Sequence, residues 1–530
     1  MIENIIAKAL QIESNMKMLR TRVYIGQLTD EVYSVYSVEE MEKIFKEDIA
    51  SEELKSSFLT WIIQYVDNHN NDSFRDFTFL CLSTLLVNTK DTKYADLLID
   101  EIHRPEYGPH AGLFLFNQIK RLYITTGLNG KSTAVDDLYW EVVDAWSDVL
   151  SEYLSPIPRE ERNKNRVVVV MLHFLNKTIA PTKTALERIK TLQDEMGKEV
   201  LCIHSREQYT NVGSLPFYGI VSGTCNENYN GLHKVDIEGQ KINLYQPPFN
   251  MPDYGEYIKI LTMIREYNPY EVIVLGDNCV LGELCAQMIP TVCIPMMFSS
   301  IPVKRINEYV AIGKSLTDAD KEYITGAGGD LENYIESTFT FELISQNKKL
   351  SREGLGLPKD KFIVSVVGIR LDYDITEEFL NKLLELTEKG IHIAFAGKYE
   401  KYNVLCESNS LLRDNSTFVG YQNDILAFQE VCDLYVNPPR SGGGFSVVEA
   451  FYMHKPGVTL GYGDVAASSG KNFWVDNLDE MMETIIRYKE DKAFYEEMSE
   501  KAYARSLELF DSKGALQHII DEVEKGKLFF

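Results

Sequence analysis

Residues 433–449 read DLYVNPPRSGGGFSVVE, and we expect the second half of the chain to be built around them. The apolar run 434–436 predicts a short strand, which the prolines at 438 and 439 end. A glycine triplet follows, and the apolar residues from Phe445 onward predict a helix. Strand, glycine turn and helix start together predict a binding site for an anion.

The chemistry of this turn favours a diphosphate. Adjacent glycines let backbone N–H groups turn inward because no Cβ obstructs them, and a helix N-terminus adds free N–H donors and a partial positive charge. The residues expected to bind there are Ser441, Gly442, Gly443, Gly444, Phe445, Ser446 and Val447, with Ser446 and Val447 offering backbone N–H groups. The two common nucleotide loops do not fit, because neither G-x-G-x-x-G nor Gly-Lys-Ser/Thr occurs here.

Glu449 has two interpretations. Ser446 and Glu449 fit the pattern S-x-x-E, in which the Glu side chain only caps its own helix. Alternatively, the Glu449 carboxylate accepts hydrogen bonds from the two vicinal hydroxyls of a nucleotide ribose. The residues alone leave both interpretations open.

Residues 418–456, which include FVGY, EVCDLYVNPPRSGGG and FSVVEAFYMHKP, resemble the donor-binding half of GT-B glycosyltransferases. The resemblance is to retaining enzymes with an E-x7-E motif, of the glycosyltransferase family 4 type, in which the second Glu binds the ribose. Glu449 occupies that place. The first Glu, which contacts the transferred sugar in that family, would stand at position 441, where this chain has Ser441.

The composition is that of a globular protein. A length of 530 residues predicts about three domains. The net charge of −25 argues against a nucleic-acid partner, which needs a basic face. No apolar run approaches the ~18 residues of a membrane span, and the first residues lack a signal-peptide pattern. The eight cysteines contain no C-x2-C pair, which predicts a cytoplasmic protein with no structural metal and no disulfide framework.

Residues 1–158 predict an all-helical N-terminal domain. Apolar residues recur at helical spacing in 52–63, 77–86 and 113–123, and the prolines at 156 and 158 mark its end. Two roles stay open for this domain. It either packs on the rest of the chain as a cap, or it contacts the acceptor or a partner. That partner would be a glycosyltransferase subunit or a second copy in a homo-oligomer.

Strand-like and helix-like segments alternate from residue 165 onward. The run VVVVM at 167–171 is typical of a strand buried on both faces. The alternation predicts two Rossmann-like units, 165–345 on the acceptor side and 360–510 on the nucleotide-sugar side. Residues 511–530 predict a C-terminal helix that could cross back to the first unit. With the resemblance, the predicted fold class is α/β of the GT-B type: two parallel-sheet domains facing a cleft, preceded by an all-helical domain. This layout also resembles the protein O- and N-glycosyltransferases of bacterial adhesin systems.

Ligands of open α/β sheets bind at the carboxyl ends of the strands, which selects Arg370 after the predicted strand 362–368. The resemblance implies that its guanidinium neutralises the diphosphate, which it can bind bidentately. The alternative is an ion pair with Asp372 or Asp374. The lysine that accompanies this arginine in the family is replaced by Ile375.

Other strand ends supply further candidates. Lys398 is expected as an auxiliary phosphate contact, Tyr421 could stack on the nucleotide base, and Gln422 could hydrogen-bond the base edge. From the opposite unit, His173 and Asp277 are candidate bases for the acceptor, because a histidine exchanges protons near neutral pH. A structural role for His173 stays open.

These observations predict a metal-independent glycosyltransferase that needs no cofactor beyond its nucleotide-sugar co-substrate. The expected donor is a UDP-hexose or UDP-N-acetylhexosamine, and the expected acceptor is a hydroxyl of a protein or glycan. Stabilisation of the departing diphosphate by Arg370 and the helix N-terminus would drive the transfer. Two alternatives remain: a catalytically silent GT-B subunit that stabilises or targets a partner transferase, and a sugar-nucleotide epimerase that uses no acceptor.

Overall fold

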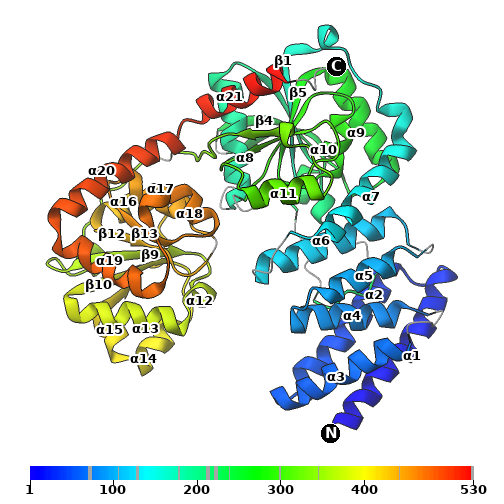
Figure 1. Cartoon of the computed structure of the whole chain (residues 1–530), viewed down its shortest axis with the longest axis horizontal. Coiled ribbons are helices and arrows are strands. Elements are labelled where there is room, and N and C mark those ends of the chain that lie inside the picture. The colour runs from blue at the N-terminus through cyan, green and yellow to red at the C-terminus, as the bar shows by residue number, and fades with distance from the viewer. Residues whose placement is uncertain are drawn as a thin grey trace.

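The computed structural model describes residues 1–530 except 70–73, 105–106, 127–130, 177–178, 210–214, 220–224, 238, 298–299, 344, 441 and 527–530. The chain forms a helical N-terminal region followed by two α/β units, and Figure 1 shows the two units side by side with the helical region below the first of them. The predicted architecture, two Rossmann-like parallel-sheet units preceded by a helical region, is confirmed.

The helical region consists of α1 (Ile2–Tyr24), α2 (Asp30–Lys43), α3 (Glu52–Asn68), α4 (Asp76–Thr89), α5 (Lys93–Ile102), α6 (Pro109–Thr126) and α7 (Thr133–Leu150). Side-chain caps fix several of its helix starts: Thr29, Ser51 and Ser132 each accept a hydrogen bond from a backbone N–H in the first turn of the helix that follows. Helix α4 is buried nearly all round, which agrees with its apolar sequence.

The first α/β unit is built on an eight-stranded sheet of order β3-β4-β2-β1-β5-β6-β7-β8. Its elements are β1 (Asn163–Met171), α8 (Ala180–Lys190), β2 (Glu199–His204), β3 (Gly231–Ile237), β4 (Gln240–Gln246), α9 (Tyr254–Tyr267), β5 (Pro269–Leu275), α10 (Val280–Ala286), β6 (Thr291–Ile294), β7 (Tyr309–Ile312), α11 (Asp318–Gly326) and β8 (Tyr334–Glu336). All neighbouring strands are parallel except the hairpin β3–β4, which extends one edge.

Strand β1 is buried on both faces, as its valine run predicts. Val168 and Val170 point into the core on the side of the helical region, whereas Val167, Val169 and Met171 point into the core under α8. Two short strands, β7 and its edge neighbour β8, were not predicted, because their apolar runs of three or four residues are too short to show a period.

The second α/β unit has a six-stranded sheet of order β11-β10-β9-β12-β13-β14, in which all paired strands are parallel. Its elements are β9 (Phe362–Gly368), α12 (Leu371–Asp374), α13 (Glu377–Glu385), β10 (Ile391–Gly397), α14 (Tyr402–Ser408), α15 (Ser410–Asn415), β11 (Ser416–Phe418), α16 (Ile425–Val431), β12 (Leu434–Val436), α17 (Gly444–Tyr452), β13 (Gly457–Leu460), α18 (Gly463–Ser469), β14 (Trp474–Val475), α19 (Leu478–Glu490) and α20 (Lys492–Leu509). The motif of residues 433–449 thus lies at the centre of this unit, on β12 and α17.

The last helix, α21 (Ser512–Lys525), leaves the second unit and packs on the first. Its residues Leu516, Ile519, Ile520 and Val523 are buried in the core under β1 and α8. Figure 1 shows α20 and α21 as consecutive helices that run from one unit to the other. A second connection therefore joins the two units besides the linker around Phe341.

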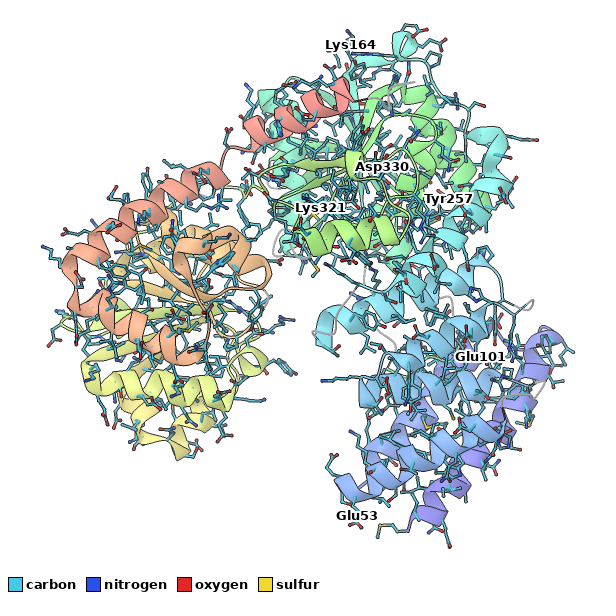
Figure 2. The ribbon with its side chains drawn as sticks, in the orientation of Figure 1. Glu53, Glu101, Lys164, Tyr257, Lys321 and Asp330 are labelled. Carbon is cyan, nitrogen blue, oxygen red and sulfur yellow. The ribbon has the colours of Figure 1, made fainter. Side chains whose placement is uncertain are left out.

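One hydrophobic core runs without interruption from the helical region into the first α/β unit. Polar contacts cross the same boundary: Trp140 Nε1 donates to the Val303 carbonyl (3.2 Å), and Tyr139 OH donates to Glu283 (3.1 Å). Tyr257 of α9, labelled in Figure 2, packs edge-on against Trp146 with ring centroids 5.1 Å apart. The helical region is therefore held firmly on the first unit. Among the described helices, none is both long and apolar enough to cross a membrane.

Candidate active site

A cavity of about 460 Å³ lies where the two α/β units face each other. The first unit contributes Ala180, Pro181, Lys183 and Thr184 at the start of α8, together with Met296, and the linker contributes Phe339 and Phe341. The second unit contributes Val367–Arg370, Asp374, Ala396, Gly397, Tyr421–Asn423, Ile425, Arg440, Gly442–Ser446, Glu449 and Asp464. These last residues lie at or after the carboxyl ends of β9, β10, β11, β12 and β13, which is where an open parallel sheet binds ligands.

The glycine turn ends β12 and starts α17 at the wall of this cavity. Gly443 is the N-cap of α17 with φ +111°, and a Cβ there would collide with Asn437 Oδ1. Gly444 is close to α18, because a Cβ would come within 2.8 Å of Ser468 Oγ, whereas Gly442 borders open space. Gly444, Phe445 and Ser446 in the first turn of α17 line the cavity, and no side chain caps this helix, which leaves the N–H groups of its first turn available to an anion. Ser441 lies outside the described residues.

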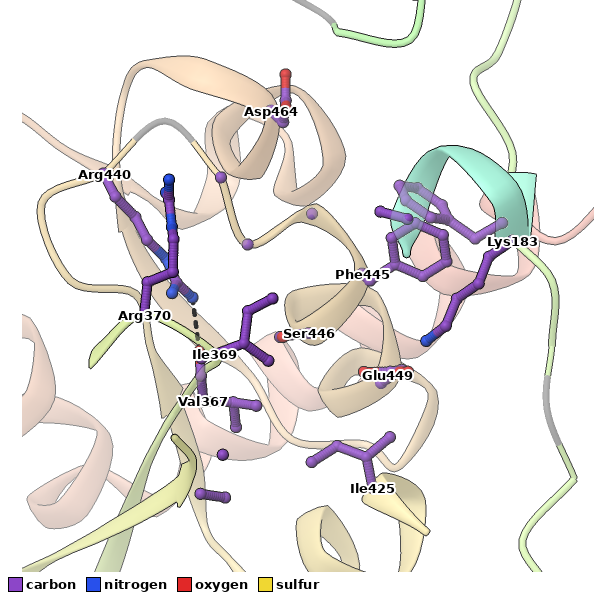
Figure 3. A pocket seen from close by; sticks show the side chains of 18 of the residues that line it. Lys183, Val367, Ile369, Arg370, Ile425, Arg440, Phe445, Ser446, Glu449 and Asp464 are labelled. Atoms are coloured by element: carbon purple, nitrogen blue, oxygen red, sulfur yellow. Dashed lines mark hydrogen bonds between the residues drawn. The ribbon is translucent and has the colours of Figure 1, made fainter. Parts of the chain in front are cut away.

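Arg440, which was not among the residues predicted from the sequence, fixes the shape of this turn through hydrogen bonds. Its guanidinium donates to Asp374 (2.7 Å), to the Val367 carbonyl (2.6 Å) and to Asn437 Oδ1 (3.1 Å), so it ties the end of β9 to the turn after β12. The side chain is about nine-tenths buried, and these acceptors balance its charge. Figure 3 shows Arg440 beside Arg370, with its bond to Val367 dashed.

Arg370 projects from the end of β9 and lines the cavity. It lies 3.6 Å from Asp374, which is the alternative ion pair considered above. Because Asp374 already binds Arg440 at 2.7 Å and the Arg370 side chain is 65% exposed, this second ion pair is weak. The Arg370 guanidinium can therefore turn to an anion in the cavity.

Glu449 lies one turn further along α17 and faces the same cavity. The capping-box interpretation is wrong, because the helix begins at Gly444 and Ser446 is already inside it. Desolvation raises the pKa of Glu449 to about 7, and the positive charge of Lys183 opposes this rise. No described residue donates a hydrogen bond to the Glu449 carboxylate or pairs with it. The carboxylate is thus available to hydroxyl donors of a ligand.

Tyr421 and Gln422 border the cavity near Ile425. The Tyr421 ring is 58% exposed, so it offers a free face for stacking. The Gln422 amide nitrogen donates to the Val419 carbonyl (2.6 Å), which orients the side chain. These positions suit the roles in base binding that the sequence suggested.

Several predicted site residues lie elsewhere. Val447 is fully buried and its N–H donates to the Gly443 carbonyl (3.1 Å), so it offers nothing to a ligand. Lys398 does not line the cavity; its side chain is 70% exposed and lies 3.9 Å from Glu400. The two differences have separate reasons: the N–H of Val447 is used by α17 itself, whereas the position of Lys398 at the end of β10 does not show which way its side chain turns.

His173 and Asp277 also do not line this cavity. They belong to a partly buried polar group that follows the carboxyl ends of β1 and β5. Burial lowers the pKa of His173 to about 4, the nearby charge of Arg121 lowers it further, and Asp277 opposes the shift. Asp277 Oδ2 accepts a hydrogen bond from Ser300 Oγ (2.5 Å). Their role as acceptor bases stays a prediction, and neither residue lines the cavity between the two units.

Lys183 and Asp464 are the other charged residues that only the structure brings to the cavity. Lys183 comes from the opposite unit, more than 180 residues before Arg370 in the chain, so no local pattern could have indicated it. Ile375, at the place of the expected second cation, instead packs against the core of the second unit. No group of three or more His, Cys, Asp or Glu residues in the described part of the chain is placed to hold a metal ion.

Comparison with known proteins agrees with this arrangement. Residues 347–505, nearly all of the second unit, match the family model described as glycosyl transferases group 1. No curated protein matches the chain. The two parallel-sheet Rossmann-like units that face one cavity have the GT-B arrangement, and the family match lies within the second of them.

Three solved structures illustrate the similarity in fold, and each has low sequence identity to this chain. HepE of Anabaena, in complex with UDP and glucose, is 14% identical over 68% of this chain and 100% of its own, with a TM-score of 0.46. A glycosyltransferase of Rickettsia africae is 13% identical over 68% and 98%, with a TM-score of 0.49. A mutant O-GlcNAc transferase of Thermobaculum terrenum is 14% identical over 97% of both chains, with a TM-score of 0.48.

Proposed function

We propose that this protein is a metal-independent glycosyltransferase that moves a sugar from a nucleotide donor to an acceptor hydroxyl. The donor would be a UDP-hexose or UDP-N-acetylhexosamine, and the acceptor a protein or glycan. One observation carries the proposal: a single cavity brings together the Arg370 guanidinium, the uncapped N-terminus of α17 and the Glu449 carboxylate. Together these groups match a diphosphate linked to a ribose diol.

The chemistry follows from this arrangement. Glu449 accepts hydrogen bonds from the two ribose hydroxyls, and Tyr421 stacks on the base. The α17 N–H groups and Arg370 face the diphosphate, whose negative charge grows as the bond to the sugar breaks. Groups held in place before the reaction stabilise that charge without reorganising. Retaining stereochemistry, which the E-x7-E resemblance implies, is part of this proposal.

A second candidate is the catalytically silent GT-B subunit that stabilises or targets a partner glycosyltransferase. It is favoured by the absence of His173 and Asp277 from the cavity and by Ser441 at the place of the first acidic residue of the motif. Under this proposal the helical region would contact the partner transferase or a second copy of the chain.

Two measurements separate the candidates. The purified protein is first mixed with UDP, GDP or dTDP and its unfolding temperature is followed; a ligand at 100 times its Kd stabilises the fold by about 2.7 kcal/mol. It is then incubated with a panel of sugar nucleotides, with and without a protein or glycan acceptor, and released diphosphate is detected. Binding with release supports the transferase. Binding without release from any donor supports the silent subunit, and no binding by any nucleotide contradicts both.

A further inference from the structure

Among the residues that the structure describes, three cationic side chains line the cavity, and their surroundings differ. Arg440 is fully engaged beneath the glycine turn, and Arg370 is weakly paired with Asp374. Lys183 differs from both, because it forms no ion pair within 4.0 Å with any residue that the structure describes. A partly buried ammonium without a counter-ion is unfavourable unless a bound anion completes its surroundings.

Lys183 lies in the first turn of α8, on the wall of the cavity that the first unit provides. Its Nζ is 5.6 Å from the centre of the Phe445 ring, at the start of α17. Phe445 in turn packs edge-on against Phe341 of the linker, with ring centroids 4.6 Å apart. Lys183 thus extends across the cleft from one unit to the helix that forms the anion site of the other. Figure 3 shows its amino group pointing toward Glu449.

Lys183 and Glu449 therefore face one cavity from opposite units with no ion pair between them. A ligand that fits between two such groups must offer hydroxyl donors to the carboxylate and an anionic oxygen to the ammonium. The ribose hydroxyls and the phosphates of a nucleoside diphosphate offer both within one molecule. A sugar without phosphate would satisfy only the carboxylate.

We propose that Lys183 is the second phosphate-binding cation of the donor site and that the acceptor-side unit supplies it across the cleft. This inference depends on the proposed function, because it assigns the cation that Ile375 fails to provide beside Arg370. The nucleotide would then be bound by both units, and its phosphates would hold α8 against α17. A donor lacking either phosphate would lose this cross-cleft contact.

The matched variants are Lys183→Met and Lys190→Met. Both remove one ammonium from α8 and keep an unbranched, flexible side chain that is one heavy atom shorter, but Lys190 is exposed at the far end of the helix and outside the cavity. Binding of UDP and of uridine is measured by calorimetry for each variant and for the wild type. We expect Lys183→Met to weaken UDP binding about tenfold and to leave uridine binding unchanged, because only UDP carries the phosphates. Lys190→Met should bind both as the wild type does.

A second measurement uses the wild-type protein and so does not depend on the folding of a variant. Lysines are acetylated in the absence and presence of saturating UDP or uridine, and the modified positions are quantified by mass spectrometry. We expect UDP to slow the labelling of Lys183 at least fivefold relative to uridine, and to leave Lys190 unaffected.

The outcomes are distinct. Equal weakening of UDP and uridine by Lys183→Met would mean that Lys183 only packs on Phe445, and this overturns the inference. The inference is also overturned if Lys183→Met leaves UDP binding unchanged and UDP does not protect Lys183 from acetylation. The proposed function is compatible with both of these results. A wild-type protein that binds none of UDP, GDP and dTDP overturns the proposed function, and this inference with it.

Discussion

Glu449 shows how the position of a carboxyl group sets its ionisation. Ser446 and Glu449 are spaced as a capping pair, but α17 begins at Gly444, so neither side chain reaches a cap. Glu449 is instead held at the cavity, where desolvation raises its pKa to about 7. A carboxylate with this pKa gains its charge as the pH rises through neutrality. Its charge, and with it ribose binding, should therefore depend on pH in the physiological range.

We expect Glu449→Gln to weaken UDP binding about tenfold at pH 8, because an amide oxygen is a poorer acceptor for a diol than a carboxylate. In the wild type, binding should strengthen from pH 6 to pH 8 as Glu449 loses its proton; in the variant this difference should disappear. Titration calorimetry of both proteins at pH 6 and pH 8 tests this. Any effect of the ionisation of UDP on its affinity is the same for both proteins, so it cancels when their pH dependences are compared. An unchanged affinity at pH 8 would leave Glu449 without a role in the ribose site.

At the scale of single elements, the turn between β12 and α17 is defined by contacts that differ from glycine to glycine. Gly443 has a φ of +111° and no room for a Cβ beside Asn437, whereas Gly442 borders open space. Hydrogen bonds hold the same turn: the Arg440 guanidinium donates to Asn437 Oδ1, and Asn437 Nδ2 donates to the Gly442 carbonyl. The position of the N–H groups in this turn therefore depends on Gly443 far more than on Gly442.

Gly443→Ala is expected to reduce the free energy of unfolding by about 1–3 kcal/mol, because alanine rarely adopts this backbone conformation and its Cβ would collide with Asn437. It should also abolish detectable UDP binding. Gly442→Ala is the matched control, and its unfolding should be unchanged within about 0.5 kcal/mol. Urea unfolding of both variants tests this, and equal stabilities would contradict our account of the turn.

Strand β5 carries a second element-scale property, since Glu271 is only 2% exposed and its Oε1 has no hydrogen-bond partner among the described residues. Burial raises its pKa from 4.5 to about 7. The unfolded chain therefore ionises Glu271 first, and the folded state loses stability as the pH rises from about 4.5 through 7. The contribution of Glu271 to the free energy of unfolding is fully present below pH 4.5, the pKa in the unfolded chain.

Glu271→Gln should remove this loss, because glutamine stays neutral. We expect the variant to gain stability relative to the wild type between pH 5 and pH 8, by an amount on the order of 3 kcal/mol at most. Urea unfolding at the two pH values gives the difference. The exposed Glu266 on α9 provides the control. Glu266→Gln should change the free energy of unfolding by the same amount at pH 5 and at pH 8. If the free energy of unfolding changed with pH in the same way in both variants, Glu271 would not be the cause of the pH dependence.

At the scale of the whole molecule, the cavity proposed to bind the nucleotide lies between two bodies with separate cores. The helical region and one face of the first sheet share a hydrophobic core that includes Phe79, and the second unit has its own core, which includes Phe451. The linker around Phe341 and helix α21 connect the two bodies. We therefore expect the helical region to unfold with the first α/β unit rather than alone.

Calorimetry should show two transitions, and each core should control one of them. Phe79→Ala, in a helix far from the sheet, should destabilise the transition of the first body by about 3–5 kcal/mol, and Phe451→Ala should do the same for the second body. Both side chains are fully buried. A separate third transition that responds only to Phe79→Ala would show that the helical region folds on its own. UDP should raise both transition temperatures, since its cavity is lined from both bodies.

The sequence by itself determined the features that depend on neighbouring residues. These features are the valine run of β1, the alternation of strands and helices, the glycine turn before α17, the place of Arg370 just after β9, and the place of Glu449 on the helix that follows the turn. They follow from local periodicity and turn chemistry. Only the tertiary structure decided which of these residues share a cavity. It placed Val447, Lys398, His173 and Asp277 outside the cavity, and it brought Lys183 and Arg440 to it. The reason is physical: the direction of a side chain and its partners across a cleft are set by packing between segments far apart in the chain, and no local pattern in the sequence records that packing.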